Sequence, residues 1–205
     1  MEFITYEVEG QIGIITINRP KALNALNSAV LDELDKTLDA VDQEAIRCLI
    51  LTGAGEKSFV AGADIGEMST LTKAEGEAFG KKGNDVFRKL ETFPIPVIAA
   101  VNGFALGGGC EISMSCDIRI CSENAVFGQP EVGLGIIAST GGIVRLARDI
   151  NRKDCMELLL TGKKIKADEA QKLGLINYVV PAEEVMDKAI ELAEQCLKNA
   201  PLALK

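Results

Sequence analysis

The chain has 205 residues, 47% of them hydrophobic and 25% charged, which is typical of one globular domain and excludes a disordered segment. Its formal net charge of -8 argues against a general binder of nucleic acid or anionic membranes, although a local pocket can still hold an anionic ligand. The absence of histidine excludes Ser-His and Cys-His nucleophile pairs and, with six cysteines that form no Cys-x-x-Cys pair, predicts no metal site.

The first third of the chain predicts the element order β-β-α-β. Residues 3–8 and 12–17 have the composition of two strands around a Glu-Gly turn. Residues 27–44 predict an amphipathic helix, because apolar residues recur on one face. That apolar stripe consists of Val30, Leu31, Leu34, Leu38 and Val41. Residues 46–52 are almost entirely apolar and predict a buried strand.

The amino terminus and the apolar segments bear on where the protein works. Residues 1–6 lack the basic region and long apolar run of a signal peptide, and no apolar segment reaches transmembrane length. Cysteines without a disulfide-like spacing are ordinary in a reducing compartment. We therefore expect a cytoplasmic protein without a membrane partner.

The middle of the chain alternates loops of small residues with regular elements. Residues 59–65 predict a loop that exposes its backbone, and the capping box Thr72-x-x-Glu75 predicts a helix that runs to about Leu90. Residues 96–101 are apolar and β-branched, as in a strand buried on both faces of a parallel sheet. The elements expected next are a glycine turn, a helix from about Cys110, a strand at 117–120 and a loop at 127–131.

The last third predicts short helices and one strand. A flexible segment between Gly133 and Gly142 precedes a helix that contains Arg145. The further elements expected are helices at 154–160 and 167–173, a strand at 175–180 and a helix that begins at Pro181. Strands and helices that alternate without a linker or repeat predict an α/β fold, with residues 1–205 as a single domain.

One glycine-rich segment, residues 101–111, joins the central strand to the next helix. Gly107, Gly108 and Gly109 permit a tight turn with exposed N–H groups, and Glu111 places a carboxylate beside those donors. Taken alone, the segment is better explained as a close helix–strand packing turn. It matches neither a phosphate-binding loop, because no Gly-Lys-Ser or Gly-Lys-Thr follows, nor the G-x-G-x-x-G dinucleotide fingerprint.

Three segments together favour acyl chemistry: residues 61–64, 107–111 and 129–131. Two separate small-residue turns can each supply one backbone N–H, which a two-donor oxyanion hole requires. Glu111 and Glu131 can act as a general acid–base pair if their elements return to the same place. Separately, Asp64 could be only a helix N-cap and Glu131 only a loop acid, but their joint occurrence favours a site.

These segments resemble the crotonase, or enoyl-CoA hydratase/isomerase, family, and within it the short-chain enoyl-CoA hydratases and 3-hydroxybutyryl-CoA dehydratases. The resemblance covers the whole chain and is carried by residues 18–26, 59–65, 96–111 and 127–135, in the family's order. It implies a crotonase-like spiral of repeated ββα units. By the family's usual length, this chain is expected to lack the final carboxy-terminal helical segment.

The resemblance also implies a role for each matched residue. The N–H groups of Ala63 and Gly108 would form the oxyanion hole. Glu111 would deprotonate the attacking water, and Glu131 would give a proton to the α-carbon. The residues implied in contacts with coenzyme A are Lys21, Ala22, Ala25, Leu26, Ala61, Gly62, Asp64 and Ile65. No tightly bound cofactor is implied, because coenzyme A arrives as part of the acyl-CoA substrate, and the family's usual assembly is a homo-trimer or homo-hexamer.

The implied reaction is the reversible addition of water to a short-chain 2-enoyl-CoA thioester, a lyase reaction of fatty acid and butyrate metabolism. The alternatives are a Δ3,Δ2-enoyl-CoA isomerase or other acyl-CoA lyase of this fold, and a truncated subunit that only binds acyl-CoA or assembles with partners. The two glutamates favour hydration, since water addition needs a base and an acid at neighbouring carbons. Residues 136–146 depart from the family's Thr-Pro-Gly-x-Gly-Gly-Thr-Gln-Arg-Leu pattern, a change that bears on the acyl pocket.

Overall fold

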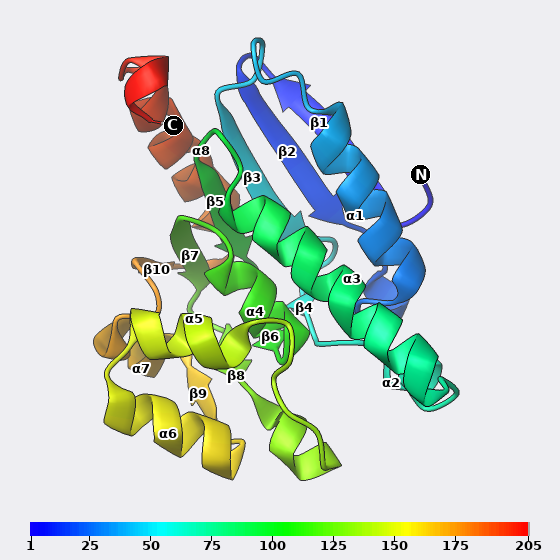
Figure 1. Cartoon of the computed structure of the whole chain (residues 1–205). Helices are drawn as coiled ribbons and strands as arrows, with labels where there is room; N and C mark the ends of the chain where they lie inside the picture. The colour runs from blue at the N-terminus through cyan, green and yellow to red at the C-terminus, as the bar shows by residue number, and fades with distance from the viewer. Residues whose placement is uncertain (205) are drawn as a thin grey trace.

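The computed structural model describes residues 1–204 and contains two β-sheets, with helices on both sides of the larger one (Figure 1). The larger sheet has the strand order β1-β2-β3-β5-β7-β10, in which β1 is antiparallel to β2 and every later pair is parallel. Its strands are β1 (Ile4–Glu9), β2 (Ile12–Ile17), β3 (Cys48–Gly53), β5 (Val97–Val101), β7 (Ile118–Ser122) and β10 (Tyr178–Val180).

The smaller sheet has the order β4-β6-β8-β9, and its first three strands are parallel. Its strands are β4 (Ser58–Val60), β6 (Phe104–Leu106), β8 (Val126–Gly128) and β9 (Lys164–Lys166). Because the carboxyl ends of parallel neighbours meet at one edge of a sheet, the segments that follow β4, β6 and β8 begin side by side. These are residues 61–65, 107–111 and 129–134.

Helices cover both faces of the larger sheet: α1 and α3 lie side by side along one face, and α8 packs on the other (Figure 1). The helices are α1 (Ser28–Ala40), α2 (Ile65–Met68), α3 (Lys73–Glu91), α4 (Gly108–Met114), α5 (Gly142–Asp149), α6 (Arg152–Thr161), α7 (Ala167–Leu173) and α8 (Val185–Leu197). Short 3-10 helices are η1 (Pro20–Ala22), η2 (Pro130–Leu134), η3 (Ala182–Glu184) and η4 (Pro201–Ala203). Within residues 1–204, no helix has both the length and the apolar character required to cross a bilayer.

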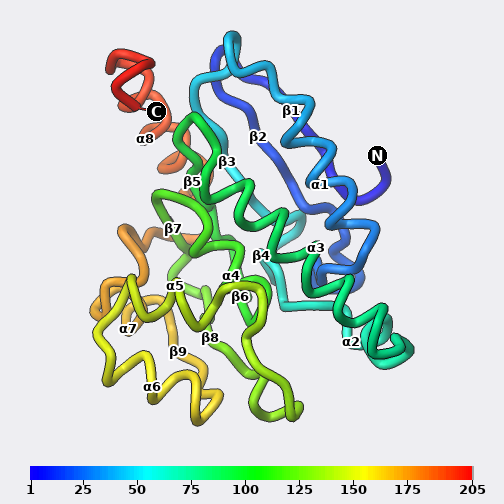
Figure 2. The backbone as a smooth tube through the Cα atoms, in the orientation of Figure 1, coloured from blue at the N-terminus to red at the C-terminus, as the bar shows by residue number. Residues whose placement is uncertain are grey.

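The chain builds both sheets at once by repeating one unit. β3, β5 and β7 each enter the larger sheet, and the next strand in each case, β4, β6 or β8, enters the smaller one. A helical segment then follows each pair of strands. Along the backbone in Figure 2, α4, β4 and β6 meet near the middle of the molecule. The predicted α/β fold of ββα units is thereby confirmed.

Alternating apolar side chains along the central strands explain why both faces of the larger sheet are covered. In β3, Cys48 and Ile50 pack toward α8, whereas Leu49 and Leu51 pack toward α1 and α3. Successive side chains of a strand point to opposite faces, so a fully apolar strand needs a layer on each side. The five residues of β5 are all buried, as predicted for the segment 96–101.

Most predicted elements lie within a few residues of the observed ones. The helix predicted at 167–173 is α7, and the capping box is present, since Thr72 N donates to Glu75 Oε2 (2.8 Å). Three elements begin at other residues than predicted. The helix expected from about Cys110 begins at Gly108, the last strand is confined to Tyr178–Val180, and α8 follows η3. Residues 59–65 and 127–131 were predicted as loops, but they include parts of β4 and β8, three-residue strands too short to show a hydrophobic period.

Candidate active site

The segments that leave β4, β6 and β8 enclose a cavity of about 250 Å³. All four predicted catalytic residues line it: Ala63 after β4, Gly108 and Glu111 on α4, and Glu131 on η2. Much of the remaining wall is apolar and comes from Leu31, Leu71, Phe79, Phe87, Leu134 and Ile137. A concave site with two carboxylates and a mainly apolar wall suits a small apolar group that undergoes proton transfer.

Ala63 and Gly108 lie next to each other in the cavity wall. Leu26 N donates to Gly62 O (2.8 Å) and Asp64 N donates to Leu26 O (2.8 Å), so Leu26 forms a parallel bridge in which Ala63 turns its own N–H to the opposite side. Gly108 is the first residue of α4, a position whose N–H has no intrahelical acceptor. A β-carbon built at Gly108 would lie 3.6 Å from the Ala63 nitrogen. The two residues therefore adjoin in the cavity wall, as a two-donor oxyanion hole requires.

The triple glycine also has a packing function. A β-carbon at Gly109 would lie 1.8 Å from the carbonyl oxygen of Val60, so only glycine lets α4 approach β4 this closely. The packing interpretation of this segment is therefore confirmed for Gly109. The close contact between α4 and β4 is also what brings the Gly108 N–H near Ala63.

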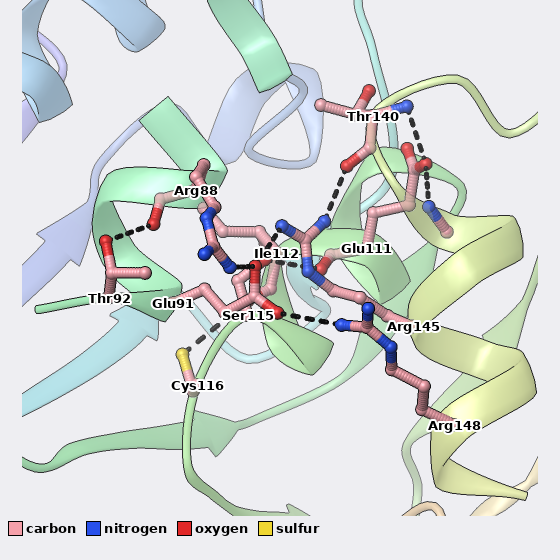
Figure 3. A network of polar contacts seen from close by, with 11 residues as sticks. Arg88, Glu91, Thr92, Glu111, Ile112, Ser115, Cys116, Thr140, Arg145 and Arg148 are labelled. Atoms are coloured by element: carbon pink, nitrogen blue, oxygen red, sulfur yellow. Dashed lines mark hydrogen bonds and ion pairs between the residues drawn. The ribbon is translucent and has the colours of Figure 1, made fainter. Parts of the chain in front are cut away.

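Glu111 is a buried carboxylate held in one orientation. Its side chain extends from α4, only 2% of the residue is exposed, and Oε1 accepts hydrogen bonds from the N–H groups of Thr140 and Gly142, each at 2.8 Å (Figure 3). Burial raises the pKa of Glu111, whereas these donors and the positive charge of Arg145 oppose the rise because they favour the ionised form. The group is thus oriented to exchange a proton with a molecule in the cavity.

Glu131 also lines the cavity, but in a different environment. Its Oε2 is buried and has no hydrogen-bond partner among residues 1–204. Burial raises the pKa of Glu131 to about 7, and the negative charge of Glu111 acts in the same direction. A carboxyl group with this pKa is substantially protonated at neutral pH and can serve as a proton donor.

The residues predicted to contact coenzyme A fall into two groups. Leu26, Ala61, Gly62 and Ile65 line the cavity. The others, Lys21, Ala22, Ala25 and Asp64, lie in the adjoining segments and outside the cavity wall. The Asp64 carboxylate accepts a hydrogen bond from Glu67 N (3.2 Å) as the N-cap of α2, and it lies 2.6 Å from Arg19 Nη1. The N-cap interpretation of Asp64 is therefore confirmed, and its side chain shapes the loop.

Three residues that contact or adjoin the carboxylates were not among the predicted site residues. Thr140 and Gly142 hold Glu111 through backbone N–H groups. Every residue except proline has such a group, so the residue types at these positions do not predict this role. Gln129 is 2% exposed, and neither polar atom of its amide has a partner among the described residues. A β-carbon at Gly142 would lie 2.9 Å from Gln129 Nε2 and 2.7 Å from Glu111 Oε1, so the amide is close to the carboxylate. The position of Gln129 in the Gln-Pro-Glu segment, two residues before Glu131, was the sequence feature that could have identified it.

Metal-ligating side chains and thiols are the other side-chain types that commonly supply chemistry at an active site. In residues 1–204 there is no group of three or more side chains of the metal-ligating types. Cys110 adjoins Glu111 in the sequence, but burial raises the pKa of its thiol to about 12, so it stays protonated at neutral pH.

Comparison with known proteins identifies a family. Residues 7–205 match the family described as Enoyl-CoA hydratase/isomerase. The chain is 56% identical over 203 residues to a short-chain-enoyl-CoA hydratase of Clostridium acetobutylicum, an alignment that covers 98% of this chain and 78% of that protein. It is 49% identical over 205 residues to a crotonyl-CoA hydratase of Syntrophomonas wolfei, covering all of this chain and 79% of the relative.

Solved structures give the same result for the fold. A crystal structure of an enoyl-CoA hydratase from Bacillus anthracis superposes with a TM-score of 0.96 at 40% sequence identity, covering 98% of this chain and 79% of the other. A carnitinyl-CoA dehydratase from Mycobacterium avium superposes with a TM-score of 0.88 at 42% identity, covering 98% and 79%. With the matched sequence, these similarities place the chain in the enoyl-CoA hydratase/isomerase (crotonase) family.

Proposed function

We propose that this protein catalyses the reversible addition of water to the α,β double bond of a short-chain 2-enoyl-CoA thioester. The observation that carries the proposal is the convergence of two carboxylates, Glu111 and Glu131, with two backbone donors, Ala63 and Gly108, on one cavity. The enzymes named above, which share about half of this sequence, support the choice of a short-chain enoyl-CoA substrate.

In the proposed reaction the thioester carbonyl accepts hydrogen bonds from Ala63 N and Gly108 N. Negative charge develops on that oxygen as water adds to the β-carbon, and fixed donors stabilise it. Glu111 takes a proton from the attacking water, and Glu131 gives its proton to the α-carbon. The two roles exchange when the 3-hydroxyacyl-CoA loses water. The pKa of about 7 at Glu131 supports its assignment as the acid in the hydration direction.

Coenzyme A is part of the substrate in this proposal, and no separate cofactor takes part. Its nucleotide end would lie along residues 21–26 and 61–65, where backbone groups of Leu26 and Ala61 adjoin the cavity. We further propose a cytoplasmic homo-trimer or homo-hexamer, formed by the single domain.

The proposal is tested with the purified full chain and crotonyl-CoA, by following the loss of absorbance of the conjugated thioester. We expect saturable turnover, an unchanged rate for the surface variant Glu194→Gln and a large loss for Glu131→Gln. Binding of the CoA ester without turnover would contradict the hydratase assignment. A parallel assay with 3-butenoyl-CoA tests the isomerase alternative, which requires conjugation of this substrate to be faster than hydration of crotonyl-CoA.

A further inference from the structure

We propose that Arg145 is a positioning residue for the reaction, and that with Glu91 it holds the turn 139–142 in the conformation that orients Glu111. This inference rests on the proposed function, because it assigns to Arg145 an effect on the proton transfer of Glu111. It rests on a continuous set of contacts from α3 through the turn to α4.

The first set of contacts joins Arg145 to the turn. Arg145 Nη1 donates to the carbonyl oxygen of Thr140 (2.8 Å), while Nη2 donates to Glu91 Oε2 (3.0 Å) at the end of α3 (Figure 3). The same residue, Thr140, donates its N–H to Glu111 Oε1 at 2.8 Å. The guanidinium and the carboxylate therefore contact the two backbone groups of a single residue.

Helix α3 holds the turn from a second direction. Asn84 Nδ2 donates to the carbonyl oxygen of Ser139 (2.8 Å). A β-carbon at Gly83 would lie 2.9 Å from Thr140 Cγ2, so the absence of a side chain at residue 83 lets the turn pack directly on the helix. With Glu91, three positions of α3 set the place of the turn.

The burial pattern of α5 shows that this arrangement is not the ordinary packing of a helix. Arg145 is only 7% exposed, whereas its neighbours Ile143 and Val144 are 42% and 53% exposed. A buried ion pair is commonly no more stabilising than apolar side chains of the same volume. The guanidinium of Arg145 therefore acts chiefly by fixing the orientation of the turn and by placing a positive charge near the Glu111 carboxylate. Arg148, on the same helix, is exposed and lies 3.7 Å from Glu91, but no hydrogen bond joins it to the turn 139–142. It therefore offers a matched cation that shares Glu91 without holding the turn.

The charges around this network fix the expected pH response. The charged groups near Arg145 are Glu91, which also pairs with Arg88 and Arg148, and Asp149, which pairs with Arg119. Burial raises the pKa of Glu111 and the positive charge of Arg145 opposes that rise, whereas burial and the negative charge of Glu111 together raise the pKa of Glu131. Removal of the positive charge of Arg145 disfavours the ionised form of Glu111. The acidic limb of the hydration profile should then move to higher pH.

The test compares Arg145→Met with the control Arg148→Met on crotonyl-CoA. Since a misplacement of about 1 Å can cost about 100-fold in rate, we expect kcat to fall by about that factor in Arg145→Met, with KM changed less than about twofold. Arg148→Met should behave as the unaltered protein. Arg145→Lys, which keeps the charge and one donor, should recover part of kcat. Glu91→Gln gives a second, milder variant if Arg145→Met does not fold.

A double-mutant cycle with Glu111→Gln distinguishes positioning from general structural damage. If Arg145 acts through Glu111, Arg145→Met causes little further loss of kcat once Glu111 is glutamine. Additive losses, or a folded Arg145→Met within twofold of the unaltered rate, would overturn the inference. An unaltered protein that does not turn over crotonyl-CoA would instead refute the proposed function.

Discussion

Gly107 lies directly against the carboxylate of Glu131: a β-carbon built at Gly107 would be 2.5 Å from Glu131 Oε1. The glycine has φ +51 and ψ -122, a conformation that residues with a side chain rarely adopt. The last residue before α4 thus forms the surface on which the second carboxylate rests. The glycine segment therefore bears on both glutamates, since Gly107 contacts Glu131 and Glu111 follows four residues later on α4.

The contact predicts that Gly107→Ala displaces Glu131 and abolishes most of the hydration activity. The matched control is Gly10→Ala, because Gly10 also has a positive φ, +61, but has open space around it. The control should lose about 1–2 kcal/mol of unfolding free energy through backbone strain and keep its specific activity. Denaturant unfolding and steady-state kinetics on both variants check this. Equal specific activities would show that the contact has no bearing on Glu131.

The proposed acid–base pair predicts that Glu111→Gln and Glu131→Gln each reduce kcat by about 100- to 10,000-fold. An amide keeps the shape of the carboxyl group but cannot exchange the proton at neutral pH. The dissociation constant of a non-reacting CoA thioester should change much less than kcat. Retention of a near-normal rate by either variant would remove that residue from the mechanism.

The raised pKa of Glu131 predicts how activity and stability depend on pH. Hydration needs protonated Glu131, so kcat/KM for crotonyl-CoA should decline as the pH rises above about 7. A folded-state pKa of about 7, against 4.5 for an ordinary glutamate, means that this group's contribution to stability is complete below pH 4.5 and is lost as pH rises through 7. In Glu131→Gln the corresponding part of the stability profile should become flat. A profile that does not differ from that of the unaltered chain would contradict this assignment.

The proposed oxyanion hole predicts the effect of removing one N–H donor. Gly108→Pro lacks that donor, yet proline is well accommodated at the first position of a helix. We expect kcat to fall by about 100- to 1000-fold. Arg152→Pro places proline at the equivalent position of α6, which lies outside the cavity wall, and should leave kcat unchanged. If the two variants lose activity to the same degree, the loss at Gly108 reflects folding.

The loop that carries Ala63 should depend on Asp64 for its stability. Asp64→Ala removes both the N-cap of α2 and the 2.6 Å ion pair with Arg19, which should cost about 1–2 kcal/mol of unfolding free energy. The exposed pair of Asp168 with Lys172 provides the comparison, and Asp168→Ala should cost less than about 0.5 kcal/mol. Thermal unfolding of the two variants measures the difference. A smaller effect at Asp64 than at Asp168 would rule out this role.

Periodicity and capping within a single segment allowed most helices and the buried strands to be predicted. The capping box at Thr72 and the apolar segment 96–101 carry their signals in adjacent residues. Strands β4, β6 and β8 carry no such signal. Each has three residues, and each forms because neighbouring units bring a partner strand beside it. The strand propensity and hydrophobic pattern of a single segment do not predict pairing with strands that are distant in the sequence.

The four predicted catalytic residues do meet in one cavity, but the supports of Glu111 could not be predicted. Thr140 and Gly142 hold Glu111 through backbone N–H groups, so their side chains give no indication of this contact. Arg145 shows the same limit, because in α5 the charged residue is buried while two apolar neighbours are exposed. The usual rule for an amphipathic helix gives the opposite answer. Only the three-dimensional contacts identify this residue as part of the site.

The bridge between Leu26 and the segment around Ala63 has a consequence for how the proposed substrate is used. Two backbone hydrogen bonds make the loop proposed to grip coenzyme A continuous with the donor proposed for the thioester carbonyl. Binding energy gained at the nucleotide end of coenzyme A can thus help to position the thioester carbonyl against its donor. A thioester of the same acyl group on a shortened, nucleotide-free thiol should therefore react more slowly even at saturation, and not merely bind more weakly.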